Sequence, residues 1–170
     1  MSLRILPCIP FLLSLMLMQS CGVLKKPMAG QGILVGEVTD SSALAQVRLT
    51  ESDTLVDGDV AGMEGIVVFT LTRESDQEEI SRAQVDAVEF RDYIARAAFD
   101  ELEPNTAYLI HTEIGTHLRM MNEGPSARFK THPGKDMSVP VQFAVVTCMN
   151  YAKFHGDNRI DKEIHLLHII

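Results

Sequence analysis

Residues 102–108, Leu-Glu-Pro-Asn-Thr-Ala-Tyr, form the most specific local pattern in this sequence. Pro104 has a fixed φ and no backbone N–H to give to a central ladder, so it marks a loop. From Tyr108 onward the side chains alternate, and Tyr108, Ile110 and Thr112 share one face of a strand. A proline-marked loop that leads directly into an alternating strand favours an antiparallel β-structure.

The same alternation recurs between residues 32 and 133, bounded by turn residues. Ala43, Ala45, Val47 and Leu49, for example, alternate with more polar neighbours, which indicates a strand with one solvated face. Six or seven strands fit this span of about 100 residues, the usual size of an immunoglobulin-like sandwich. Residues 83–92 fit either an extra strand or a short helix, and both remain open. The other expected strands are 33–38, 43–49, 65–73, 94–100, 106–114 and 126–131.

The opening stretch also carries a resemblance. Leu102, Pro104, Thr106 and Tyr108 resemble the tyrosine-corner segment of fibronectin type III domains, Leu-x-Pro-x-Thr-x-Tyr. In that family the phenol hydroxyl reaches back to a backbone group and fixes the crossover between two strands. We therefore expect a mainly β fold, an immunoglobulin or fibronectin type III-like antiparallel sandwich over residues 32–133, and a structural role for these four residues.

Composition and charge limit the function. The chain has 170 residues and a formal net charge of −8, with no low-complexity run. Nucleic-acid binding requires a basic stripe that displaces counterions, and the close basic pair Lys25-Lys26 is no such stripe. The sequence therefore argues against a nucleic-acid partner.

The first 21 residues have the layout of an export signal. Arg4 precedes an apolar run over residues 5–18, which is shorter than the roughly 20 apolar residues that span a bilayer. Leu17-Met-Gln-Ser-Cys21 resembles a bacterial lipobox, whose cysteine becomes acylated. The alternative is ordinary signal cleavage with Cys21 incidental. We expect an exported lipoprotein held in the cell envelope by a lipid on Cys21, facing the periplasm or the cell surface, with residues 22–31 as a linker and order beginning near Gly32.

The pattern changes after residue 133. Residues 139–146 end in the continuous apolar run Phe143–Val146, which is typical of a strand buried on both faces. A polar loop follows, and the pattern then predicts a helix from Ile160 to Ile170. Strand, loop and helix are the start of an α/β unit, but a doubly buried strand needs neighbours that residues 134–170 do not supply. The sequence predicts an incomplete α/β unit here.

Residues 143–151, Phe-Ala-Val-Val-Thr-Cys-Met-Asn-Tyr, resemble the start of the catalytic domain of PhoD-like alkaline phosphatases, in which a β-sandwich also precedes this segment. The resemblance implies hydrolysis of phosphomonoesters and phosphodiesters at an iron centre beside calcium ions. It assigns a metal-ligand role to Cys148 and positions next to the metal ligands to Asn150 and Tyr151. No catalytic residue is carried over.

One cysteine cannot perform that chemistry, because hard cations need several fixed oxygen ligands and phosphate hydrolysis needs metals that activate water. We therefore expect this chain to bind neither iron nor calcium stably and to be inactive alone, so its status as an enzyme stays open. The alternatives are a membrane-tethered sandwich that acts as a binding module and a subunit whose catalytic remainder is encoded separately. We expect no metal or catalytic site at eight further acidic and histidine candidates: Asp53, Asp57, Asp59, His111, His117, His155, His165 and His168.

Overall fold

The computed structural model describes residues 25–55 and 60–140. The chain divides into two compact units, Met1–Met137 and Ser138–Ile170. The second unit lies almost wholly outside the described residues. The first unit contains eight described strands and one short 3₁₀ helix. These elements are β1 (Ile33–Gly36), β2 (Ala43–Arg48), β3 (Gly65–Arg73), β4 (Glu79–Ala87), η2 (Glu89–Arg91), β5 (Ile94–Phe99), β6 (Ala107–Gly115), β7 (Met121–Glu123) and β8 (Ala127–Lys130).

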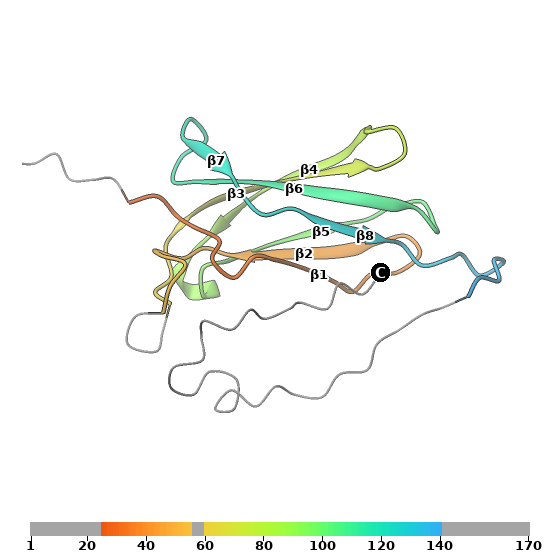
Figure 1. Ribbon diagram of the computed structural model, residues 1–170, viewed down its shortest axis with the longest axis horizontal. Coiled ribbons are helices and arrows are strands. Elements are labelled where there is room, and N and C mark those ends of the chain that lie inside the picture. The colour runs from red at the N-terminus through yellow and green to blue at the C-terminus, as the bar shows by residue number, and fades with distance from the viewer. Residues whose placement is uncertain (1–24, 56–59, 141–170) are drawn as a thin grey trace, which may run out of the picture. The chain divides into compact units, whose positions relative to one another are not determined.

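The strands form two antiparallel sheets that face each other (Figure 1). One sheet has the order β1-β2-β5, and the other has the order β4-β3-β6-β7, with β8 also paired to β6. This is the expected immunoglobulin or fibronectin type III-like sandwich, and the mainly β fold class is confirmed. Most of the incomplete α/β unit that the sequence predicts over residues 134–170 lies outside the described part of the chain, and residues 134–140 contain a turn and no strand.

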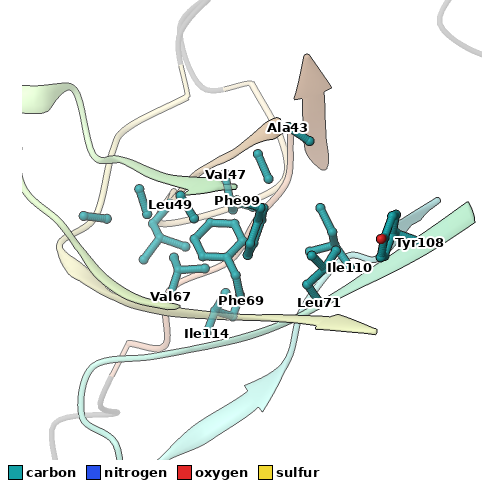
Figure 2. Packing of buried hydrophobic residues seen from close by; sticks show 14 of the residues in the cluster. Ala43, Val47, Leu49, Val67, Phe69, Leu71, Phe99, Tyr108, Ile110 and Ile114 are labelled. Atoms are coloured by element: carbon teal, nitrogen blue, oxygen red, sulfur yellow. The ribbon is translucent and has the colours of Figure 1, made fainter. Parts of the chain in front are cut away.

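The core lies between the sheets and follows from the alternation in the sequence. Ala43, Ala45 and Val47 of β2 are buried while the residues between them are only partly buried, as the period-2 pattern predicts. Figure 2 shows Phe69 and Phe99 at the centre of the cluster. Alanines on β2 and β5 leave room for large side chains from the facing sheet, which allows dense packing. The fully buried large residues include Tyr108, Phe69, Phe99, Leu49, Leu71, Ile110, Val47 and Val67.

The undecided stretch, residues 83–92, contains both of the proposed elements. It holds the end of β4 and the short helix η2. β4 is an edge strand with a mostly exposed or half-buried sequence, so its apolar signal is weak. Asp92 and Tyr93 follow with φ values of 53° and 58°, a left-handed pair that ends the helical turn.

Two short strands, β7 and β8, occupy the edge position beside β6 in the second sheet. Both strands pair with β6, β7 at Glu113–Gly115 and β8 at Ala107–Ile110. Pro125 lies between them and has no N–H for the ladder, so the strand is interrupted there. The sequence predicts a strand over residues 126–131, which matches β8, but it does not predict β7.

The segment before Gly32 is part of the sandwich, which corrects the expected start of order. Met28 and Thr50 form an antiparallel bridge with reciprocal N–H···O bonds of 2.9 and 2.8 Å, and Pro27 is buried. These contacts join residues far apart in sequence, so local composition could not reveal them. Within the described residues, no helix has the length and apolar character that a membrane span requires.

Candidate functional site

The residues that the sequence assigned to metal binding, Cys148, Asn150 and Tyr151, lie outside the described residues, and so does the acylation candidate Cys21. Within residues 25–55 and 60–140, no group of three or more His, Cys, Asp or Glu side chains is placed to hold a metal ion. His111, His117 and Asp53 are exposed there. None of these three belongs to such a group, and Asp57, Asp59, His155, His165 and His168 lie outside the described residues.

Residues 102–108 form a fixed corner where β6 begins. The buried hydroxyl of Tyr108 accepts a hydrogen bond of 2.9 Å from the backbone N–H of Glu103, five residues upstream. Leu102 is buried, and its N–H donates to the carbonyl oxygen of Ser41 at 2.9 Å. The Tyr108 ring stacks on Phe129 with its centroid 5.5 Å away. The phenol thus joins the loop to the core, which is the role of a tyrosine corner.

The same corner also holds Thr131, the residue that follows β8. The hydroxyl of Thr131 donates to the carbonyl oxygen of Glu103 at 2.6 Å and accepts from the N–H of Thr106 at 2.9 Å. The Thr106 hydroxyl donates to the carbonyl oxygen of Pro104 at 2.9 Å. Thr131 is 2% exposed, so its hydroxyl makes these bonds shielded from solvent. The chain therefore leaves the sandwich from a fixed position.

An ionic cluster lies beside the corner. Arg73 donates to Asp76 and Glu78 at 2.8 Å each and to Glu103 at 3.1 Å. The hydrogen bond from Arg73 is the main cause that lowers the pKa of Asp76 below 3.8, and the bond to Asp76 is the main cause that raises the pKa of Arg73. The cluster ties the β3–β4 turn to the corner loop, while the buried Nε of Arg73 has no partner among the described residues.

Sequence reasoning missed Arg73 and Thr131 as members of the corner. Arg73 stands directly before the acidic turn 74–79, a signal for a local ion pair, but its contact with Glu103 spans 30 residues. In the sheet register, Arg73 lies opposite Tyr108 on the neighbouring strand. Arg73 and the corner loop come together only through this strand pairing, so the sequence could not reveal the full cluster.

The arrangement has a mechanical role. Its polar groups are backbone amides, hydroxyls and paired ions, and the bonds of Thr131 and Arg73 to Glu103 join segments that are distant in sequence. A catalytic site would need a nucleophile next to a base or a set of metal ligands. The corner instead fixes the start of the segment that carries the chain toward Cys148.

Comparisons with known proteins agree with the fold. No protein-family model matches the chain, and no curated protein matches it. A solved structure of PhoD is 21% identical with a TM-score of 0.54, and the match covers 66% of this chain and 21% of the PhoD chain. A redesigned β-sandwich protein is 23% identical with a TM-score of 0.42, covering 64% of this chain and 96% of its own. A human fibronectin type III domain is 9% identical with a TM-score of 0.41, covering 74% and 88%.

The likeness to PhoD shows the fold of the sandwich. This chain spans about a fifth of the PhoD chain that it matches, since the covered share is 21%. The sandwich is therefore similar to part of a much longer protein.

Proposed function

We propose that this chain is the N-terminal part of an exported, lipid-anchored PhoD-like alkaline phosphatase or phosphodiesterase, and that residues 1–170 alone do not hydrolyse phosphate esters. One observation carries the proposal. A sandwich similar to part of PhoD is followed, a short segment after β8, by the Phe143–Tyr151 motif that resembles the start of the PhoD-like catalytic domain.

The corner supports this order of parts. Thr131 and the N–H of His132, which donates to the carbonyl oxygen of Thr39 at 2.8 Å, fix the backbone immediately before Pro133. A catalytic part that follows would start from a rigid base. In this proposal the sandwich anchors and presents the hydrolase, and Cys148 supplies one thiolate ligand to an iron centre completed by residues beyond this chain.

A metal and activity assay tests the proposal. The 170-residue chain is purified, supplied with iron and calcium, and assayed with p-nitrophenyl phosphate and its bis-ester. We expect no turnover and no stoichiometric iron. Metal-dependent turnover that Cys148→Ser abolishes would contradict the proposal, because the chain would then contain a complete centre.

A second experiment supplies the proposed catalytic remainder. The chain is co-expressed with the protein encoded by the adjacent reading frame, and the complex is tested for iron and for hydrolysis of both esters. We expect the complex to gain both properties and Cys148→Ser to remove the iron. A wild-type complex that hydrolyses the esters and keeps all of its iron in the Cys148→Ser form would show that Cys148 is no ligand.

A second candidate function is a membrane-tethered binding module, favoured by the outer face of the β1-β2-β5 sheet. Two neighbouring hollows of about 460 and 450 Å³ lie on this face and share Ile94 in their lining. Leu34 is 62% exposed beside them, and the cationic side chains Arg48 and Arg96 line the two hollows. Truncation after Pro133 distinguishes the readings. In the Cys21→Ser form, which lacks the proposed lipid anchor, a binding module keeps its retention on isolated cell envelopes without the tail, whereas the phosphatase hypothesis predicts that truncation removes the iron and activity gained with the catalytic remainder.

A further inference from the structure

The loop between β6 and β7 exposes two large apolar side chains. Leu118 is 56% exposed and Met120 is 47% exposed. The N–H of Met120 donates to the carbonyl oxygen of His117 at 2.8 Å, which closes a tight turn around Leu118 and Arg119. This turn presents apolar surface together with a cation.

The N-terminal segment lies against the same turn. A hollow of about 160 Å³ is lined by Lys25, Lys26 and Pro27 from this segment and by Met120 from the β6–β7 loop. The Nζ of Lys26 lies 3.4 Å from the side-chain oxygen of Asn122, the residue after Met121 on β7. The two segments therefore form one surface, which we call the basic–apolar end: Lys25, Lys26, Met28, Leu118, Arg119 and Met120.

The charge of this end differs from that of the whole protein. The chain carries −8 overall, yet Lys25, Lys26 and Arg119 are cationic. Of the carboxylates nearby, Glu51 pairs with Lys25 at 2.6 Å, and Glu123 lies on β7 beyond Asn122. Cations interspersed with exposed apolar side chains are the pattern that binds the surface of an anionic membrane.

The position of this end in the chain identifies its partner. Cys21 precedes Lys25 by four residues, a reach of at most about 14 Å even when fully extended. A lipid on Cys21 would hold the basic–apolar end next to the bilayer at a high effective concentration, so a surface of weak intrinsic affinity would stay bound.

We infer that the basic–apolar end rests on an anionic lipid surface and orients the sandwich on the membrane, an inference that rests on the proposed acylation of Cys21. β6 runs from Ala107 to Gly115, about 27 Å at the usual rise per residue. Figure 1 shows β7 and the described start of the chain at one end of the sandwich and the segment after β8 at the other. The corner and the segment after β8 therefore face away from the lipid.

The absence of tryptophan from the sequence allows a direct test. The chain from Cys21 onward, which retains every described strand, carries Cys148→Ser and is coupled through the Cys21 thiol to a maleimide lipid in phosphatidylglycerol-containing vesicles. Leu118→Trp reports on the basic–apolar end. Leu34→Trp is the matched control, because Leu34 is similarly exposed, at 62%, on the outer face of the other sheet.

We expect the Leu118→Trp emission to shift to shorter wavelength on these vesicles and to be quenched by lipids brominated in the upper acyl chain. The Leu34→Trp emission should do neither. Adding Lys26→Gln and Arg119→Gln to Leu118→Trp should abolish the shift. Equal responses at residues 34 and 118, a response at residue 34 alone, or a shift that survives the charge substitutions would each overturn the inference.

Chemical coupling separates this test from the proposed acylation. Acylation is measured independently, from the mass of the protein extracted from membranes and of its Cys21→Ser form. An unmodified Cys21 would refute the anchor in the proposed function, while the vesicle measurement would still decide whether the basic–apolar end binds lipid.

Discussion

The two ends of the sandwich are built differently. At the corner end, the Tyr108 hydroxyl, the Thr131 hydroxyl and the Arg73 guanidinium hold the loops by hydrogen bonds and ion pairs. At the basic–apolar end, Leu118 and Met120 are exposed on a turn. These side chains lie outside the core, and together with Lys25, Lys26 and Arg119 they form the surface that we infer to contact lipid. One end therefore fixes the chain, and we infer that the other contacts lipid.

The largest effect should come from the core that joins both ends. Phe69 is fully buried in the middle of β3, opposite Thr112 of β6. Phe69→Ala should reduce the free energy of unfolding by about 3–5 kcal/mol, because it removes a large buried ring and leaves a cavity. Urea unfolding followed by circular dichroism and by tyrosine fluorescence should give one coincident transition. Two separate transitions would mean that the ends fold independently.

The next effect is confined to the corner end. Tyr108→Phe keeps the ring and removes the hydroxyl that accepts from the N–H of Glu103. It should reduce the free energy of unfolding by about 1–3 kcal/mol, since a buried N–H loses its acceptor. Tyr93→Phe is the control, because no hydrogen bond of the Tyr93 hydroxyl is found within the described residues, and it should change stability by less than about 0.5 kcal/mol. Equal losses in the two variants would show that the corner bond is unimportant.

A smaller effect is expected from the ionic cluster, as a dependence of stability on pH. Arg73 lowers the pKa of Asp76 in the folded protein below 3.8. The stabilisation is therefore fully present above that value and is lost as the pH falls through the folded pKa. Asp76→Asn should be less stable than wild type at neutral pH by a small margin that shrinks in acid. A margin constant across the acid range in thermal melts would contradict this assignment.

The smallest effect belongs to the basic–apolar end in solution. Leu118→Gln should change the free energy of unfolding by less than about 0.5 kcal/mol, because the side chain is mostly exposed and outside the core. Chemical denaturation without vesicles is the measurement. A loss as large as that of Tyr108→Phe would show that Leu118 serves the fold and would remove the contrast between the ends.

Much of the fold could be read from alternation. The expected strand 65–73 has the bounds of β3, and Ala43, Ala45, Val47 and Leu49 are all buried. β2 has one face in the core, so its sequence carries the period directly, whereas Val67, Val68 and Phe69 of β3 are buried in succession. β7 has three residues and lies on an edge, which is too short for a period to emerge. The Met28–Thr50 bridge was missed because it depends on residues distant in sequence.

The candidate site was predictable only in part. The loop and the role of the Tyr108 phenol were predictable from residues 102–108, because proline and the following alternation are local signals. Thr131 and Arg73 join the corner through strand pairing, which a single sequence does not encode at any fixed spacing. Cys148, Asn150 and Tyr151 lie outside the described residues, so their assignment to a metal centre stays a prediction.

Amide hydrogen exchange on the chain coupled to anionic vesicles tests the contrast between the two ends most directly. We expect the Glu103 amide to exchange slowly both in solution and on vesicles, because its N–H donates a hydrogen bond to the Tyr108 hydroxyl. The exposed amides of residues 117–119 should exchange fast in solution and become protected on vesicles. Protection that appears on vesicles at the corner end, with residues 117–119 unchanged, would contradict the account.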